Sequence, residues 1–364
     1  SYPDCVPVLT DGVVTLRSHI ESDIVAMTEM CRDPEFVRWT TVPDPYDTSN
    51  ARAYVEEFVV PGWERHHRGW AIEYDGRFAG NIDVRGKGVA DVGFGLHPKA
   101  RGHGVMTRAL RLATRWAFDH TEVEIVHWRA HVGNVASLRA AWSAGFTLHD
   151  VAPGFLYERG RVIDAWTGTI RPDADGTPRT PWFRSPVIEG EKVRLRPFAD
   201  SDIPRIVEAC SDPTTRLWIP PMPDPYTEAA ARTYLTSTVW QAATGEAAYW
   251  CVADPDTDEL VGNIGVLRMN AATSAGEIGY WMHPSARGRG LMSEATRLVV
   301  RHALTPIADG GLGRRRLELY AAAGNGPSNA VARNAGFEFV GTRHGAERLA
   351  DGTYADLNGY ELLA

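Results

Sequence analysis

The ten residues HPKARGHGVM at 97–106 occur again as HPSARGRGLM at 283–292, with seven of the ten positions identical. Each copy contains Arg-Gly-x-Gly and leads into apolar residues at helical spacing. A strand, a tight glycine turn and a helix are therefore expected in both places. The two copies are 186 residues apart, a spacing much longer than the roughly 20–50 residues of a solenoid repeat. The sequence thus predicts one domain present twice.

Other matches occur in the same order along both halves. The tetrapeptide PDPY at 43–46, for example, occurs again at 223–226. A stretch containing four prolines separates the two halves and is expected to be a semi-extended connector. The predicted segments are an N-terminal domain at 1–170, a proline-rich linker at 171–186 and a C-terminal domain at 187–364.

The apolar pattern predicts an α+β fold for each copy. Alternating apolar residues indicate strands, whereas apolar residues three or four apart indicate helices. Asp23 is expected to cap the first helix. In the first copy we expect strands at 13–17, 70–74, 78–84, 91–96 and 125–130, and helices at 23–31, 50–58, from about 103, and 136–144. Each domain should hold a mostly antiparallel central sheet flanked by helices.

Composition narrows the classes of function. The 364 residues include 46 acids against 38 lysines and arginines, a net charge of -8. General binding to nucleic acid or anionic membranes needs a positive surface and is disfavoured, whereas a cationic amine is compatible with this charge. The four cysteines form no CxxC pair, so no metal site is expected. No basic and apolar leader and no run of about 18 apolar residues occurs, which predicts a cytoplasmic protein.

The Arg-Gly-x-Gly turns carry the strongest chemical signal. Free N–H groups at a helix N-terminus attract anions, and glycine lets the backbone come close to a ligand. A pyrophosphate would fit there, with His103 or Arg289 adding positive charge. The alternative is a tight turn without a ligand. The turn is not a P-loop, because no Gly-Lys-Ser/Thr follows, and it lacks the third glycine of a dinucleotide fingerprint.

A second pattern, Asn-x-x-Ser followed by a helix and Gly-Phe, also occurs twice. It consists of Asn134 and Ser137 in the first copy, and of Asn325 and Ser328 in the second. The asparagine can contact an amide-rich ligand, and the serine can donate a proton. Both residue types are also common helix caps, so either pattern alone is ambiguous.

Together with EIGYW at 277–281, RGRGLM at 287–292 and NGPSNAVARNAGF at 325–337, these patterns resemble the GNAT superfamily of N-acetyltransferases. The chain is most similar to the RimJ/RimL branch, which acetylates the N-termini of ribosomal proteins. The resemblance covers nearly all of both halves, so it implies two tandem GNAT domains. It also implies acetyl-CoA as cosubstrate and no metal.

The resemblance further implies which residues hold the coenzyme. The pyrophosphate would lie on the glycine turn, and the pantetheine arm along the preceding strand and against the asparagine. In the first domain the implied residues are Gly95, Leu96, Arg101, Gly102, His103, Gly104, Val105, Met106 and Asn134. In the second they are Tyr280, Trp281, Met282, Arg287, Gly288, Arg289, Gly290, Leu291, Met292 and Asn325.

Two departures from the family pattern matter. Met106 and Met292 stand where relatives usually have Gly or Ala, so they either crowd the site or pack into the core. Many relatives carry a tyrosine, the acid for the leaving thiolate, where this chain has Ala141 and Ala332. The resemblance therefore assigns the acid role to the two serines of the Asn-x-x-Ser patterns.

Direct attack of an amine on the thioester, through a tetrahedral intermediate, needs a group that takes a proton and donors for the oxyanion. Glu277 and its counterpart Asp91 are the candidate bases, or else ordinary carboxylates near strand ends. An acidic and aromatic lip would suit a cationic amine. Its candidate residues are Asp44, Tyr46 and Trp39 in the first domain and Asp224, Tyr226 and Trp218 in the second. Proline-fixed turns and core aromatics are the alternative.

We therefore expect an acetyl-CoA-dependent N-acetyltransferase that acts on a peptide N-terminus or a small-molecule amine. The second domain is favoured as the active one, because of Arg289, Glu277 and Ser328. The alternative is a tandem acyl-CoA-binding module or scaffold with one or both sites silent. Neither nucleic acid nor membrane is an expected partner, and the chain is expected to be a monomer, as a pseudo-dimer, or a homodimer.

Overall fold

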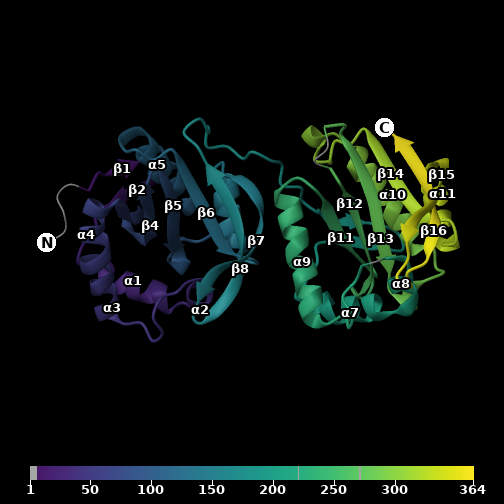
Figure 1. Cartoon of the computed structure of the whole chain (residues 1–364), viewed down its shortest axis with the longest axis horizontal. Helices are drawn as coiled ribbons and strands as arrows, with labels where there is room; N and C mark the ends of the chain where they lie inside the picture. Colours follow the sequence, from purple (N-terminus) through teal and green to yellow (C-terminus); the bar gives the residue numbers. More distant parts are fainter. Residues whose placement is uncertain (1–5, 220, 270–271) are drawn as a thin grey trace. The chain divides into compact units, whose positions relative to one another are not determined.

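The computed structural model describes residues 6–219, 221–269 and 272–364, so Cys5 and part of the segment after Met269 lie outside it. The chain divides into two compact units, Ser1–Arg179 and Thr180–Ala364. Each contains one eight-stranded sheet (Figure 1). In the first the strand order is β1-β2-β3-β4-β5-β6-β8-β7, and in the second it is β9-β10-β11-β12-β13-β14-β16-β15 with the same topology. The prediction of two α+β domains with mostly antiparallel sheets is confirmed.

The elements of the first unit agree closely with the apolar pattern. The predicted helix at 50–58 is part of a longer helical segment that includes a π-helical stretch at Tyr54–Val59. The strands are β1 Leu9–Thr10, β2 Val14–Arg17, β3 His67–Tyr74, β4 Arg77–Lys87, β5 Val89–Leu96, β6 Ile125–His131, β7 Thr147–Glu158 and β8 Arg161–Ile170. The α-helices are α1 Asp23–Arg32, α2 Pro34–Trp39, α3 Thr48–Ala53, α4 Val60–Gly62, α5 Val105–His120 and α6 Val135–Ser143.

The second unit repeats this order with small changes in length. Its strands are β9 Ile188–Glu189, β10 Arg194–Arg196, β11 Ala248–Ala253, β12 Leu260–Leu267, β13 Ala275–Met282, β14 Arg316–Ala322, β15 Glu338–Arg348 and β16 Tyr354–Leu363. Its α-helices are α7 Ile203–Ser211, α8 Pro213–Trp218, α9 Glu228–Ala243, α10 Leu291–Leu304 and α11 Gly326–Asn334. In the described ranges, no helix is both long enough and apolar enough to cross a membrane.

The central strands of each sheet are buried on both faces. On β3, Ala71 packs into a cluster formed by α1 and α3. Its neighbour Trp70 points to the opposite face, where its ring lies 5.4 Å from that of Trp116 on α5. Successive side chains of a strand point to opposite faces, so a strand covered on both sides is apolar at nearly every position. The central strands are therefore held between two helical layers.

One pair of neighbouring strands in each sheet is parallel and only briefly paired. β5 pairs with β6 from Val89 to Asp91 and then separates from it, although β5 stays paired with β4 as far as Leu96. In the second unit β13 pairs with β14 from Ala275 to Ile278 and separates from it before Met282. Each sheet consequently opens along one edge of its central strand, directly before the glycine turn.

The start of the first helix differs from the prediction. Asp23 does not cap α1, whose N-cap residue is Ser22. The Asp23 carboxylate instead accepts a hydrogen bond from the backbone N–H of Ile20 and binds Arg17 at 2.7 Å. A short loop between strand and helix thus uses a buried ion pair where a cap was expected.

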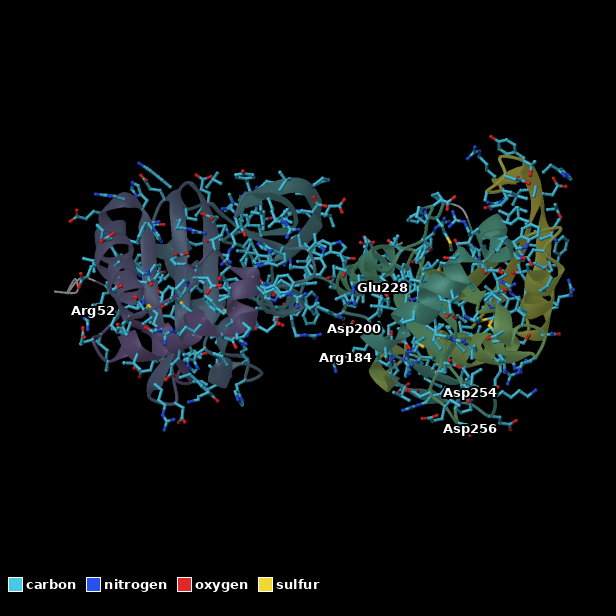
Figure 2. All side chains as sticks on the ribbon, turned by 90° about the horizontal axis from the view of Figure 1, so that it is seen from below. Arg52, Arg184, Asp200, Glu228, Asp254 and Asp256 are labelled. Carbon is cyan, nitrogen blue, oxygen red and sulfur yellow. The ribbon has the colours of Figure 1, made fainter. Side chains whose placement is uncertain are left out.

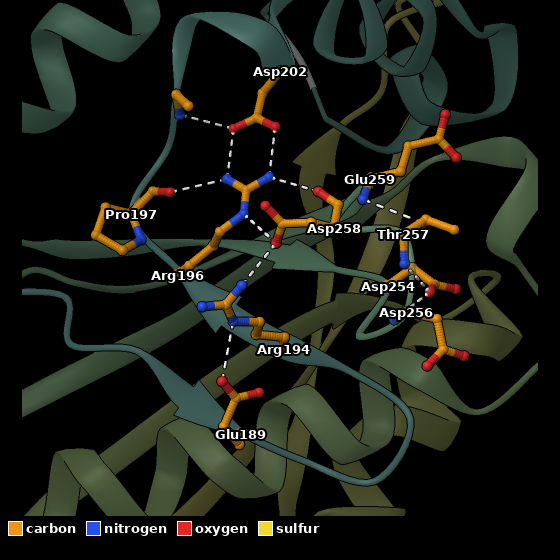
Figure 3. Close-up of polar contacts among 11 residues, drawn as sticks. Glu189, Arg194, Arg196, Pro197, Asp202, Asp254, Asp256, Thr257, Asp258 and Glu259 are labelled. Carbon is orange, nitrogen blue, oxygen red and sulfur yellow. Dashed lines mark hydrogen bonds and ion pairs between the residues drawn. The ribbon is translucent and has the colours of Figure 1, made fainter.

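The matching pair in the second unit is the centre of a larger network (Figure 3). Arg196 makes a bidentate contact with Asp202, at 2.9 Å to each oxygen, and donates to the backbone oxygen of Pro197. It also donates to the side chain and backbone of Asp258 in the β11–β12 hairpin. Arg196 and Asp202 are 9% and 3% exposed. A buried ion pair leaves a costly unpaired charge if one partner is removed.

We predict that Asp202→Ala lowers the free energy of unfolding by about 3–5 kcal/mol, because the buried Arg196 guanidinium loses two hydrogen bonds. Asp256→Ala is the matched control: Asp256 lies with Asp254 at the exposed hairpin of the same unit (Figure 2) and should change stability by less than about 0.5 kcal/mol. Urea unfolding of both variants tests this. Equal midpoints for the two variants would contradict the role of the ion pair.

Candidate active site

The glycine turn has the same backbone in both units. Gly102 and Gly104 have φ of +81° and +70°, and Gly288 and Gly290 both have +74°. A side chain is strained at these angles, which explains the glycines. No other atom lies within 4 Å of where a Cβ would stand at any of the four. The turn is therefore open on the outside, and the first N–H groups of α5 and α10 lie beside it.

The arginines of the two turns bind protein carboxylates. Arg101 Nη2 lies 2.7 Å from Asp33, and Arg287 Nη2 lies 2.7 Å from Asp212. Each aspartate also caps a short helix, accepting from Phe36 N–H in one unit and Thr215 N–H in the other. The arginine side chains thus anchor the turn to α2 or α8. The groups that remain to attract an anion are the backbone amides, the helix dipole and the side chains of His103 and Arg289.

The side chains that directly follow each turn are buried. Val105, Met106, Leu291 and Met292 are 1–6% exposed. The two methionines therefore pack inward, and Met106 also lines the cavity of the first unit. Trp281 is also buried, in a cluster with Ile203. The edge offered by the open strand is consequently made of main-chain N–H and C=O groups at 93–96 and 279–282, the stretches expected to bind pantetheine.

The Asn-x-x-Ser asparagine caps the helix in both units. Asn134 Oδ1 accepts from Ser137 N–H at 3.2 Å, and Asn325 Oδ1 accepts from Ser328 N–H at 3.3 Å. An asparagine that uses its oxygen in this way keeps its amide hydrogens for another partner. In each unit the capping asparagine and the serine follow the strand that separates from the central strand, and so stand at the opening of the sheet.

The serine hydroxyl has a different partner in each unit. In the first, Trp128 Nε1 donates to Ser137 Oγ at 3.0 Å. An indole N–H can only donate, so the serine proton is free for another acceptor. In the second, Ser328 Oγ lies 2.9 Å from the hydroxyl of Tyr280, and burial raises the pKa of Tyr280 to about 12. The partners lie on different strands, because Phe94 replaces Tyr280 in the first unit and Leu319 replaces Trp128 in the second.

A cavity of about 700 Å³ brings many of these groups together in the first unit. Its walls come from α1, α2, the open edge of β5, the end of β6, the start of α6 and the end of β7. Arg159, in the turn between β7 and β8, donates to the backbone oxygens of Thr40 and Val42 and ties that hairpin to the loop after α2. Predicted residues that line it are Gly95, Leu96, Arg101, Met106, Asn134, Ser137, Trp39 and Tyr46.

The two candidate bases have different surroundings. Asp91 Oδ2 lies 2.7 Å from Arg85 and 3.0 Å from Arg129, and Asp91 is not among the residues that line the cavity. Glu277 is half-buried beside Arg268, whose Nη1 lies 2.9 Å from Oε2. Burial raises the pKa of Glu277, the nearby Glu318 and Glu347 add to this, and Arg268 opposes it. A raised pKa makes a carboxylate a better proton acceptor.

The residues of the expected substrate lip are separated by the fold. Tyr46 and Tyr226 are buried at 6% and 9%, and each hydroxyl pairs with the thiol of a helix cysteine, Cys31 or Cys210.

The carboxylates and tryptophans of this lip have other surroundings. Asp224 is 84% exposed near Arg216, and Asp44 is exposed and outside the residues that line the cavity. Trp39 lines the cavity, while Trp218 lies against Gly324, directly before Asn325. Aromatic residues thus border the opening, but the two aspartates do not.

Sequence reasoning missed an imidazole and a carboxylate in this cavity. His131, the last residue of β6, and Glu158, the last residue of β7, both line it, and His131 Nε2 lies 2.5 Å from Glu158 Oε2. The one available signal was a mismatch between the copies, since Ala322 stands where the first copy has His131. Within the described residues no group of three or more His, Cys, Asp or Glu side chains could hold a metal ion.

Parts of the chain are similar to known proteins. A ribosomal-protein-serine acetyltransferase of Escherichia coli (strain K12) is 36% identical over 103 residues, 28% of this chain and 54% of that protein. The chain therefore spans about half the length of this curated relative.

Solved structures include RimL, a ribosomal L7/L12 alpha-N-protein acetyltransferase in complex with coenzyme A. It is 24% identical to this chain, with a TM-score of 0.43. The match covers 49% of this chain and 98% of the RimL chain. Mycobacterium smegmatis RimJ in complex with CoA-disulfide is 21% identical, with a TM-score of 0.42. The match covers 47% of this chain and 82% of the RimJ chain.

The family described as "Acetyltransferase (GNAT) domain" matches residues 14–147 and again residues 192–338. These two ranges cover well over half of the sequence, and one falls in each structural unit. The chain belongs to the GNAT acetyltransferase family and contains its domain twice.

Proposed function

We propose that the chain is an acetyl-CoA-dependent N-acetyltransferase that transfers an acetyl group to a primary amine. The observation that carries this proposal is the cavity of the first unit, where the open strand edge, the capping asparagine and the serine border a single space. The second unit repeats the turn, the strand opening and the Asn-x-x-Ser geometry.

The donor set of each unit suits coenzyme A. In each unit two glycines leave open space around a helix N-terminus, where main-chain amides would bind the pyrophosphate. Main-chain groups on the open strand edges at 93–96 and 279–282 would pair with the amides of the pantetheine arm, apart from the Gly93 N–H, which Asp83 accepts. Asn134 or Asn325 would donate to the same arm.

Acetyl-CoA supplies the activated acetyl group, and the chain supplies positioning and proton transfer. Ser137 keeps a free hydroxyl proton at the opening of the sheet, and Ser328 has the Tyr280 hydroxyl behind it. The pKa of about 12 keeps Tyr280 protonated throughout the neutral range, so it can act as a donor there. In the second unit Glu277 is the proposed base, and main-chain N–H groups of the central strand are the proposed oxyanion donors.

The proposed acceptor is the free amine of a peptide N-terminus, with a small-molecule amine as the alternative. The names of the similar proteins support the first choice, since they are acetyltransferases of ribosomal proteins. An acceptor of this kind would place the enzyme in the cytoplasm. The aromatic border made by Trp39 would contact the residue that carries the amine.

We predict that Gly104→Asp and Gly290→Asp each remove one coenzyme A site. Aspartate tolerates the left-handed backbone better than most residues do, and the space around each glycine is open, so the fold should persist. The new carboxylate would repel the pyrophosphate at the helix N-terminus and weaken binding at that site by at least about tenfold. Calorimetry with coenzyme A should show two sites in the wild type and one in each variant.

The matched controls are Gly104→Asn and Gly290→Asn, which have the same shape without the charge. They should keep both sites, with affinities reduced only a few-fold. Unchanged stoichiometry in the aspartate variants, or equal loss in the asparagine variants, would refute anion binding at the turn. A wild type that binds no coenzyme A would refute the proposed function.

Ser137→Ala and Ser328→Ala should lower turnover more than affinity. Each is measured in a chain whose other unit carries the Gly→Asp change, so only one site contributes. We expect kcat to fall about 100-fold with the coenzyme Kd within twofold, because the serine acts on the developing charge. Thiol release with acetyl-CoA and a panel of peptides and amines gives kcat. Wild-type rates in both variants would assign the acid role elsewhere.

Tyr280→Phe tests the donor behind Ser328. The first unit already holds Phe94 at this position, so the phenyl ring alone is compatible with the fold. In a Gly104→Asp background we expect kcat to fall about tenfold with coenzyme binding unchanged. The converse change Phe94→Tyr, in the Gly290→Asp background, is the control and should leave turnover within a few-fold. Equal kcat for Tyr280→Phe and its parent would contradict this role.

A further inference from the structure

The first unit needs a proton acceptor other than the one that the sequence suggested. Asp91 is held by two arginines and does not line the cavity. Asp83 does line it, but its carboxylate is occupied by His67 Nε2 at 2.9 Å and by the backbone N–H of Gly93 at 3.1 Å. Glu35 accepts from the indole of Trp39 and lies at the exposed rim. None of these three combines free basic capacity with a position inside the cavity.

His131 combines both. Its side chain is 14% exposed and lines the cavity together with Asn134 and Ser137, which follow it directly in the chain. Glu158 holds Nε2 at 2.5 Å, and an ionised carboxylate can only accept, so Nε2 carries the hydrogen and Nδ1 presents a lone pair. In the part of the chain that the structure describes, nothing hydrogen-bonds to Nδ1. Trp39 packs edge-on against the ring, with centroids 6.0 Å apart, and restricts its orientation.

We propose that His131, oriented by Glu158, is the general base of the first unit and takes the proton from the attacking amine. This inference rests on the proposed function and concerns that same site. The carboxylate–imidazole arrangement fixes one tautomer and stabilises the imidazolium that forms, which is the usual reason for such pairs. The acceptor is therefore an amine small enough at its reactive end to pass Trp39 and reach the end of β6.

The proton and electron balance is simple. Acetyl-CoA supplies the thioester: a bond forms between the amine nitrogen and the carbonyl carbon, the carbon–sulfur bond breaks, and its electron pair leaves with sulfur. His131 Nδ1 takes the proton that the nitrogen loses and passes it to water. Ser137 gives its hydroxyl proton to sulfur and recovers one from water.

The second unit has other residues at the positions of His131 and Glu158. Ala322 occupies the position of His131, three residues before the capping asparagine. Leu349 occupies the position of Glu158, because each lies four residues after a glycine whose N–H binds the matching aspartate, Asp164 or Asp356. Conversely, Leu267 and Tyr320 replace Arg85 and Arg129, the two arginines that occupy Asp91, and so the counterpart Glu277 lacks them. Glu277 instead contacts Arg268, at 2.9 Å, so the candidate bases of the two units stand at different positions and have different partners.

Other charges face the same space and will influence the pH profile. Besides Glu158 of β7, the charged residues that line the cavity are Glu35 of α2, Asp83 and Arg85 of β4, Arg101 of the glycine turn and Arg129 of β6. Arg85 is paired with Asp91, and Arg101 is paired with Asp33. A general base accepts a proton only in its unprotonated form, so the rate should fall on acidification as the base becomes protonated.

The test uses the full chain with Gly290→Asp, so that turnover comes from the first unit alone. His131→Ala and Glu158→Gln are compared with His149→Ala, a histidine of the β7–β8 hairpin that hydrogen-bonds to Thr169 and does not line the cavity. We expect His131→Ala to lower kcat about 100-fold or more and to remove the acidic limb of the pH profile. Glu158→Gln should lower kcat about tenfold, and His149→Ala should match the parent.

Two further readouts separate catalysis from structure. Coenzyme A affinity and stoichiometry by calorimetry should be unchanged in His131→Ala, and added imidazole should restore part of its rate. Unchanged kcat and pH profile in His131→Ala, or loss of its coenzyme binding without rescue by imidazole, would overturn the proposal. A parent chain that binds coenzyme A but releases no thiol would also overturn it, whereas a parent that binds no coenzyme A would refute the proposed function as well.

Discussion

The separation of two parallel strands is the constraint on which the site depends. β5 and β6 pair over only three residues, and β13 and β14 over four, before they diverge. A buried strand that loses one neighbour has unpaired N–H and C=O groups, which need another partner. The first strand of each diverging pair leads into the glycine turn and its helix, and the second leads to the capping asparagine. A ligand rich in amides and ending in a pyrophosphate matches this arrangement of groups.

The duplicated chain preserves this framework and varies the chemistry around it. Both units keep the left-handed glycines, the arginine–aspartate anchor of the turn and the asparagine cap. The partner of the serine has moved from Trp128 on one strand to Tyr280 on another. Framework residues are constrained by backbone geometry, whereas proton donors and acceptors can enter the same space from different strands.

Much of the fold could be predicted from the sequence, because the repeated Arg-Gly-x-Gly turn and the apolar periodicity both reflect local constraints. The π-helical stretch at Tyr54–Val59 and the use of Asp23 in an ion pair were missed, since both depend on tertiary packing. The burial of the methionines after the turn, and the place of Met106 in the cavity wall, could not be read from the sequence.

The site was harder to predict than the fold. His131 and Glu158 are 27 residues apart and meet only because β6 and β7 both flank β8 in the sheet. Asp91 looked equivalent to Glu277, but two arginines from neighbouring strands occupy it. Sequence comparison within the chain finds what the copies share, and the catalytic differences lie where they disagree.

The proposed site depends on main-chain amides at each glycine turn that bind the coenzyme's pyrophosphate. Amide hydrogen exchange, measured with and without coenzyme A, reports on these amides. We expect slower exchange at residues 102–108 and 288–294 in the presence of coenzyme A. Unchanged exchange at both turns, in a chain shown to bind coenzyme A, would contradict it.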